Sequence, residues 1–200
     1  GLNDFGRTGK LMSRRSETSD AQAKVNLREQ AEILAEAGVD LLVAEATGST
    51  EQRHWVIEAC VSTGLPVWAG FKCRLDTNKE LKVGYRSEEV FESSLDALLA
   101  LGAEVATIFH STVEATSMAL PVMQKHWKGP IGVYPDANRE DYVATYRDGT
   151  KDTGVTPEEY VEVTKEWVNQ GAQIIGGGCG FEIEYIRPLR EMLPKELASN

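Results

Sequence analysis

The sequence contains few cysteines and no long apolar run. Only three of its 200 residues are cysteine, at positions 60, 73 and 179, which is too few and too scattered for a disulfide framework. We therefore expect a reducing, cytoplasmic location. No apolar run approaches the roughly 18 residues that cross a bilayer, and the chain does not open with the apolar segment of a secretory signal. It also begins without Met, so we expect a processed product, a fragment or an incompletely read chain.

Positive charge is also scarce. The chain has 21 Lys and Arg against 31 Asp and Glu, for a formal net charge of −10. Nucleic acids and anionic membranes both favour clustered Lys and Arg, so neither is an expected partner. A hydrophobic share of 42% and a charged share of 26% are typical of a soluble globular protein. The length is that of one ordinary domain.

Short apolar runs alternate with helix-like segments along most of the chain. Ser19 and Asp20 are good N-cap residues for the first helix, and glycines follow several of the later ones. Residues 1–18 are polar and read as an irregular N-terminal segment, whereas 19–200 read as one domain. The expected strands cover residues 39–44, 66–71, 104–109, 131–134 and 172–175. The expected helices cover residues 20–38, 51–63, 87–101, 113–126, 157–170 and 182–192.

This alternation predicts an α/β fold with a parallel sheet and helices outside it. The five predicted strands each read as apolar on both faces. A (β/α) barrel of the TIM type needs about 250 residues for its eight units. The chain is therefore either an open sheet or a barrel without its first three βα units. In the second case the edge strand 39–44 needs a cover, either residues 1–18 or a partner subunit, and a homo-oligomer stays open.

In a parallel α/β fold, the residues that follow the strands share one rim. Five candidate side chains fall there: Glu45, Cys73, His110, Asp136 and Cys179. Each also has a structural interpretation. Glu45 could be a solvated carboxylate, Asp136 a turn residue, and Cys73 an inert, half-buried thiol. His110 could be a hydrogen-bonded structural histidine.

The segment 173–180 carries three successive glycines before Cys179. Glycine tolerates positive φ and lets the backbone approach a ligand closely, which makes Gly177 and Gly178 candidates for binding a substrate. A phosphate cradle is disfavoured, because no Walker-type lysine follows and the dinucleotide-binding spacing is absent.

Four segments resemble the homocysteine S-methyltransferase family of zinc-dependent (β/α)8 barrels. Residues 30–47 are similar to the family's helix and fourth strand, which end in a Glu-Thr pair. Residues 64–71 resemble its fifth strand, and residues 133–138 its Tyr-Pro-Asn-Ala-Gly turn. Residues 156–180 resemble its seventh helix and eighth strand. The resemblance runs in order from about residue 20 to residue 192, the C-terminal two-thirds of such a barrel.

The resemblance implies a zinc-dependent methyltransferase. Family members bind zinc through three cysteines, one after strand six and an adjacent pair after strand eight, and the homocysteine thiol becomes the fourth ligand. A zinc-bound thiol is deprotonated at neutral pH and can attack the methyl group of a donor. Glu45 matches the family position that holds the amino group of the substrate.

Two of the three zinc-ligand positions differ here. The cysteine pair stands as Gly178 and Cys179, and the strand-six Asn-Cys stands as Phe109 and His110. His and Cys both bind zinc, so His110 and Cys179 are the predicted metal ligands and catalytic residues. Asp136, Glu45, Gly177 and Gly178 are the predicted substrate-binding residues. Cys73 is a candidate third ligand that lies elsewhere on the rim.

Three functions stay open from the sequence. The first is a methyltransferase that acts on a homocysteine-like thiol, with an altered metal site. The second is a non-catalytic relative that binds a small amino-acid-like or methylated ligand. The third is a metal-free barrel enzyme that uses His110 as a general base with Glu45 or Asp136.

Overall fold

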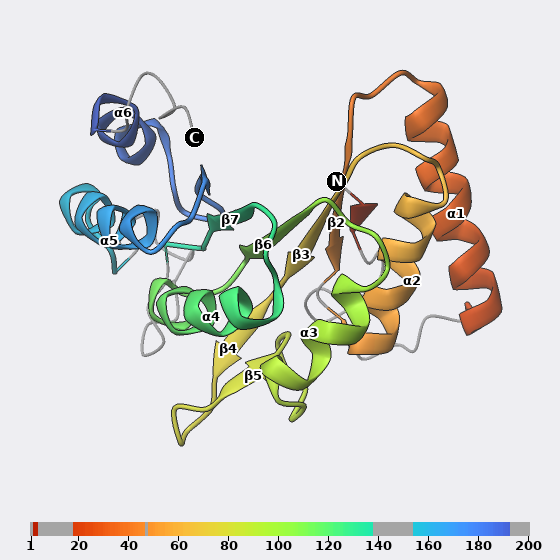
Figure 1. The fold of residues 1–200 in the computed structure, drawn as a ribbon, viewed down its shortest axis with the longest axis horizontal. Coiled ribbons are helices and arrows are strands. Elements are labelled where there is room, and N and C mark those ends of the chain that lie inside the picture. The colour runs from red at the N-terminus through yellow and green to blue at the C-terminus, as the bar shows by residue number, and fades with distance from the viewer. Residues whose placement is uncertain (1, 4–17, 47, 138–153, 193–200) are drawn as a thin grey trace, which may run out of the picture.

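The main feature of the fold is a six-stranded parallel sheet (Figure 1). The computed structural model describes residues 2–3, 18–46, 48–137 and 154–192. In spatial order the strands are β1 (Leu2–Asn3), β2 (Leu42–Ala46), β3 (Val67–Phe71), β6 (Val105–Phe109), β7 (Ile131–Tyr134) and β8 (Ile174–Ile175). Every pairing between neighbours in this sheet is parallel. This confirms the predicted α/β class, with the sheet left open in the described residues.

The helices surround the sheet on three sides in Figure 1. Helices α1 and α2 lie on one side, α3 and α4 in front, and α5 and α6 on the other side. Their bounds are Asp20–Glu36 for α1, Thr50–Val61 for α2, Phe91–Leu99 for α3, Val113–His126 for α4, Pro157–Asn169 for α5 and Ile183–Met192 for α6. Side-chain caps start several of them: Ser49 and Thr156 form capping boxes at α2 and α5. No helix in the described parts of the chain is long and apolar enough to span a bilayer.

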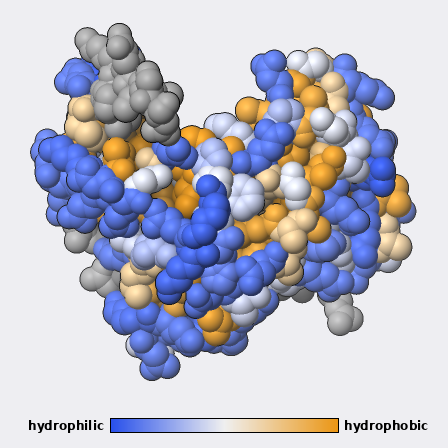
Figure 2. All heavy atoms as spheres, in the orientation of Figure 1, coloured by the Kyte–Doolittle hydropathy of each residue, from blue (hydrophilic) through white to orange (hydrophobic). Residues whose placement is uncertain are grey.

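The two faces of β2 differ in burial, whereas all five residues of β6 are buried. On β2, Leu42, Ala44 and Ala46 are buried, whereas Val43 and Glu45 are only half-buried. The buried residues belong to the hydrophobic core that packs under the helices. The strand predicted over residues 39–44 was expected to be apolar on both faces; β2 instead extends to Ala46 and carries Glu45 on the same face as Val43. Its second face lines the concave side of the open sheet, and Figure 2 shows a hollow between the α1 and α6 sides of the molecule.

The edge of the sheet next to β2 is covered by the chain itself. Leu2 pairs with Ala44 and Asn3 with Glu45 in parallel register. Residues 1–18 were expected to be irregular, so this short strand is a correction at Leu2 and Asn3; the remainder of that segment up to residue 17 lies outside the described residues.

A β-hairpin follows β3 that the sequence reading missed. It pairs β4 (Cys73–Leu75) with β5 (Leu81–Val83) in antiparallel fashion. Asp76 closes the turn, because its carboxylate accepts hydrogen bonds from the backbone N–H groups of Asn78 and Glu80, both at 2.8 Å. The alternating Cys73–Leu75 and Leu81–Val83, separated by polar turn residues, are the signal that could have revealed it.

The same hairpin delays the next helix. Helix α3 begins at Phe91 and not at residue 87 as predicted. Val90 instead forms an antiparallel bridge with Lys82, and the Val83 N–H donates to the Glu89 carbonyl at 2.9 Å. The residues that precede the helix therefore complete the hairpin.

His126 links the end of α4 to α3. Its Nδ1 lies 2.6 Å from an Asp96 carboxylate oxygen, and its Nε2 lies 3.1 Å from a Glu92 carboxylate oxygen. The hydrogen bond with Asp96, and then that with Glu92, raises the pKa of His126.

We therefore expect His126→Gln to destabilise the protein at mildly acidic pH and to matter little at alkaline pH. A raised folded-state pKa contributes stability that is complete below the unfolded-state pKa of about 6.5 and is lost as the pH rises through the folded-state value. Urea unfolding of both proteins at about pH 6 and about pH 9 measures the difference. An equal loss at both pH values would contradict a charged His126 link.

Candidate metal and substrate site

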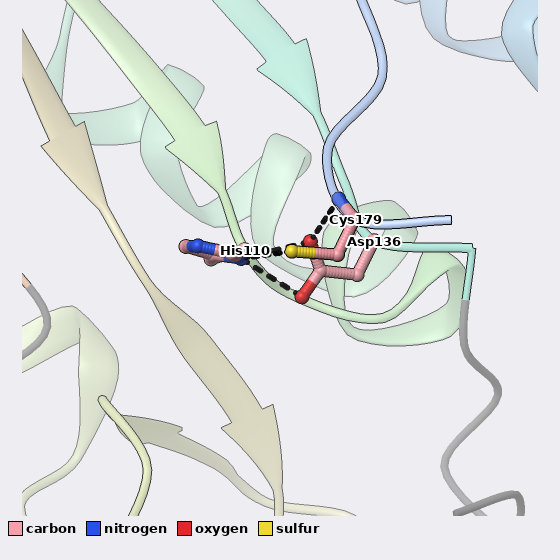
Figure 3. Close-up of side chains that lie close together, drawn as sticks. All are labelled: His110, Asp136 and Cys179. Atoms are coloured by element: carbon pink, nitrogen blue, oxygen red, sulfur yellow. Dashed lines mark hydrogen bonds and ion pairs between the residues drawn. The ribbon is translucent and has the colours of Figure 1, made fainter. Parts of the chain in front are cut away.

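Three predicted rim residues come together after β6, β7 and β8 (Figure 3). His110 directly follows β6, Asp136 follows β7 and Cys179 follows β8. One donor atom from each of these three lies within 4.8 Å of the others. His110 is half-buried, Asp136 is buried, and Cys179 is exposed. The parallel strands thus deliver one imidazole, one carboxylate and one thiol to the same place.

Asp136 stands at the centre of this group. Its two carboxylate oxygens lie 2.8 and 2.9 Å from Nδ1 of His110. The backbone N–H of Cys179 donates to the same carboxylate at 2.9 Å, and Sγ of Cys179 lies 3.8 Å from Nδ1 of His110. The carboxylate and the thiol therefore face the same ring nitrogen, while the other ring nitrogen points away from them (Figure 3).

Backbone hydrogen bonds tie the three loops together. The Asp136 N–H donates to the Ser111 carbonyl at 2.8 Å, which joins the loop after β7 to the loop after β6. The Ala137 N–H donates to the Cys179 carbonyl at 2.9 Å, and the Gly178 N–H donates to the Pro135 carbonyl at 2.7 Å. The site geometry is thus fixed by the main chain as well as by its side chains.

His110 adopts an unusual backbone conformation that a buried lysine supports. Its φ is +50°, in the left-handed region that non-glycine residues rarely occupy. The ammonium group of Lys72, just after β3, donates a hydrogen bond to the His110 carbonyl. Lys72 also lies over the ring of Tyr85, 3.8 Å from its centroid.

The surroundings favour the protonated form of the Cys179 thiol. Burial raises the pKa of Cys179, the negative charge of Asp136 raises it further, and the Lys72 charge opposes the shift. Burial, followed by the charges of Asp136 and Cys179, also raises the pKa of Tyr85 to about 12. Lys72 and Tyr85 therefore border the site, Lys72 through its hydrogen bond with His110 and Tyr85 through its contact with Lys72.

Sequence reasoning missed both residues. Lys72 directly follows Phe71 at the end of β3, so the rule that selected Cys73 could have selected it. Tyr85 follows β5, and its position could not be seen without the hairpin.

The donor set fits a transition-metal ion. Imidazole nitrogen, thiolate sulfur and carboxylate oxygen are all zinc ligands, and catalytic zinc sites keep three protein ligands and one open position. Within the described residues, His110, Asp136 and Cys179 form the only such group of three.

Glu45 lies at the same end of the sheet but outside this group. It is half-buried on β2, opposite Gly70 of β3. Burial is the main cause that raises the pKa of Tyr134, and the charge of Glu45 adds to it. Tyr134 OH also lies 3.2 Å from the Thr107 hydroxyl. Glu45 is therefore near the Tyr134 hydroxyl, and its role in holding a substrate amino group stays a prediction.

Cys73 does not join the group. It is buried, its N–H donates to the Ser111 hydroxyl at 2.9 Å, and its sulfur lies 3.4 Å from the same hydroxyl. It packs in the hydrophobic core under the helices, more deeply than the half-buried position that the structural interpretation expected.

Neither Gly177 nor Gly178 has room for a side chain, because other parts of the chain occupy the space beside them. A Cβ on Gly177 would lie 2.5 Å from Cβ of Phe181, and one on Gly178 would lie 2.6 Å from an Asp136 carboxylate oxygen. Neither glycine has a positive φ, which in this loop occurs at Gly180. The glycines are thus required for close packing, and substrate binding by Gly177 and Gly178 stays a prediction.

Known structures share this fold. The apo form of the homocysteine methyltransferase MmuM from Escherichia coli superposes with a TM-score of 0.61 at 20% identity, over 84% of this chain and 55% of that one. A putative phosphonomutase from Burkholderia cenocepacia gives a TM-score of 0.58 at 14% identity, over 84% of this chain and 72% of that one. At these identities the likeness concerns the fold alone. It places the chain in the class of TIM-barrel proteins.

The family follows from the sequence match. The family model described as homocysteine S-methyltransferase matches residues 2–193. The chain therefore belongs to the homocysteine S-methyltransferase family, as the resemblance of its segments predicted.

Individual relatives are distant and longer. A selenocysteine methyltransferase from Astragalus bisulcatus is 27% identical over 172 residues, which cover 83% of this chain and 48% of that protein. The S-methylmethionine–homocysteine S-methyltransferase BHMT2 from Pongo abelii is 27% identical over 189 residues, which cover 88% of this chain and 51% of that protein. The chain spans about half the length of the curated relatives it matches.

The burial of the cysteines predicts a selective alkylation pattern. Cys179 is exposed, whereas Cys60 and Cys73 are buried, and burial raises the pKa of Cys60 to about 12. Since the thiolate is the reactive form, we expect iodoacetamide to modify Cys179 first in the folded protein and all three cysteines after denaturation. Mass spectrometry of peptides checks this. Modification of Cys60 as fast as Cys179 would contradict the described packing.

Proposed function

We propose that this chain forms part of a methyltransferase that transfers a methyl group to a homocysteine-like thiol, with an altered zinc site. The observation that supports it best is the meeting of His110 and Cys179 at the carboxyl end of the sheet, 3.8 Å apart between Nδ1 and Sγ. Membership of the family supplies the reaction class. The acceptor and the donor are proposed as small molecules.

The reaction needs a sulfur nucleophile and a methyl donor in line. The acceptor sulfur forms a bond to the methyl carbon while the bond from that carbon to the donor sulfur or nitrogen breaks. The electron pair of the broken bond stays on the donor, which leaves as a thioether or an amine. Zinc, when bound, would keep the acceptor sulfur as a thiolate at neutral pH.

The residues of the chain bind and orient the reactants. His110 and Cys179 would hold the ion. The ammonium group of Lys72 fixes the backbone of His110 by donating a hydrogen bond to the His110 carbonyl. Glu45 would receive the amino group of the acceptor, at the same end of the sheet. Methyl transfer to a thiolate needs no general acid or base, so its rate depends mainly on this alignment.

A metal-free enzyme is the second candidate, because the hydrogen bond between His110 and Asp136 resembles a base and its orienting carboxylate. Asp136 accepts from Nδ1 of His110 at 2.8 Å, which leaves Nε2 on the opposite side of the ring. A neutral Nε2 could accept a proton from a substrate. A non-catalytic relative is the third reading, and no contact in the described residues favours it specifically.

Zinc content and chelation test the leading proposal. We expect about one zinc per chain, and methyl transfer from S-methylmethionine or betaine to homocysteine. Methionine formation is followed by mass spectrometry. A chelator should abolish turnover and added zinc should restore it. Protein without zinc that gives no methionine with either donor would contradict the proposal, and thermal stabilisation by ligands alone would then support the non-catalytic reading.

His110→Ala separates the metal-dependent and metal-free readings. With a metal-dependent reaction, the variant loses zinc and turnover together. With a general base, the variant loses turnover as well, but a chelator leaves turnover of the wild-type protein unchanged. His54→Ala is the matched control, since His54 lies on α2 and pairs only loosely with Glu58, at 4.0 Å.

A further inference from the structure

We infer that Asp136 is the third protein ligand of the metal ion, and that Gly178 is glycine because the Asp136 carboxylate occupies the space beside it. This inference rests on the proposed metal site and assigns a ligand that the sequence did not identify. Asp136 was expected to bind substrate.

The first step concerns which nitrogen of His110 binds the ion. An ion held by both His110 and Cys179 has to lie between the sulfur and a ring nitrogen. Sγ lies 3.8 Å from Nδ1, and Nε2 points to the opposite side of the ring (Figure 3). Nδ1 is therefore the ligand atom.

The second step concerns the position of Asp136. In many zinc sites a carboxylate accepts a hydrogen bond from the histidine nitrogen that does not bind the metal. Here both carboxylate oxygens lie 2.8 and 2.9 Å from Nδ1, the nitrogen that faces the sulfur. Once Nδ1 binds an ion it has no proton to donate to Asp136. The carboxylate is then left beside the ion, where it serves as a ligand.

The third step is steric. A Cβ built on Gly178 would lie 2.6 Å from Oδ1 of Asp136 and 3.0 Å from the Pro135 carbonyl oxygen. Contacts below about 3 Å cannot be accommodated without movement of the carboxylate or of the backbone. Any side chain at position 178 and the Asp136 carboxylate in its present place thus exclude each other.

The fourth step concerns the burial of the Asp136 carboxylate and the charges around it. Asp136 is 8% exposed and is fixed by the Cys179 N–H at 2.9 Å and by its own N–H on the Ser111 carbonyl. A buried carboxylate requires charged or hydrogen-bonding partners.

The charges of the ligands indicate the kind of ion. With Cys179 as a thiolate and Asp136 as a carboxylate, a divalent ion gives a neutral centre before the acceptor binds. This favours an ion of the zinc type, which accepts nitrogen, oxygen and sulfur together.

Zinc affinity of the apoprotein, measured by competition with a chromophoric chelator, tests the inference without relying on turnover. We expect Asp136→Ala to weaken zinc binding by more than about 100-fold, beyond the 10- to 100-fold loss that is usual for a hydrogen-bonding partner outside the ligand set. Gly178→Ala should also weaken binding, because its Cβ displaces the carboxylate. Asp96→Ala is the matched control: it removes another histidine-paired aspartate, from His126, and should bind zinc as the wild type does.

A rescue variant tests the exclusion between positions 136 and 178. Asp136→Ala combined with Gly178→Cys should regain zinc binding, and its cobalt-substituted form should show a stronger sulfur-to-cobalt charge-transfer band than the wild-type protein. Far-UV circular dichroism of each apoprotein verifies folding. If Asp136→Ala does not fold, Asp136→Asn keeps the shape and removes the charge.

The outcomes separate the inference from the proposal beneath it. If the wild-type protein binds no zinc, the proposed metal site fails. If the wild type binds zinc and Asp136→Ala binds it within about 100-fold, Asp136 is only an outer partner and the inference is overturned. A larger loss together with rescue by Gly178→Cys supports it.

Discussion

The site depends on the backbone hydrogen bonds that join the loops after β6, β7 and β8. Asp136 N–H to Ser111 O, Ala137 N–H to Cys179 O and Gly178 N–H to Pro135 O form a continuous series across the carboxyl end of the sheet. Parallel pairing brings the three strand ends to one edge, but it does not by itself bring three side chains within 4.8 Å. The loop bonds do so, because they prevent each loop from turning away from its neighbour.

The sheet below this edge explains why the loops can be so constrained. Its helix-facing side carries small and branched residues such as Ala44, Ala69 and Ile108, all fully buried under the helices. Burial of such surface contributes roughly 25 cal/mol per Å², so the core stabilises the strands that carry these loops. Glu45 and Tyr134 are half-buried and lie outside the hydrophobic core. These two positions can therefore vary without loss of the core.

The sequence was informative where a signal is local or periodic. The strand 131–134 and the helix 113–126 coincide with β7 and α4, because short apolar runs and N-cap residues determine both. The hairpin of β4 and β5 was missed, since three-residue strands do not stand out between longer elements. The late start of α3 follows from the same omission, as Val90 pairs with Lys82 of the hairpin.

The site was predictable only in part for a related reason. The rule that parallel strands share a rim selected His110, Asp136 and Cys179, and the structure brings these three together. It also selected Cys73, which turns into the core, because one residue more or less after a strand reverses the direction of a side chain. The role of Asp136 depends on which nitrogen of His110 it faces, and no sequence pattern contains that information.

Buried positive charge behind the rim completes the electrostatics of the site. Arg53 is fully buried, and its Nη2 donates to the Lys72 carbonyl at 2.7 Å. Desolvation lowers the pKa of Arg53 to about 10, while the charges of Cys73 and Glu89 oppose the shift. Its Nε and Nη1 have no hydrogen-bond partner among the described residues.

Arg53 is thus an expensive group to bury, and its one described hydrogen bond fixes the backbone of Lys72. Lys72 in turn holds the carbonyl of His110. Its charge opposes the effect of Asp136 on Cys179. The charge of Lys72 therefore offsets part of the cost of placing a carboxylate and a thiol together on the rim, and Arg53 contributes through the Lys72 backbone. A site that only orients a neutral histidine does not need a cation beside it, whereas a site that brings anionic groups together does.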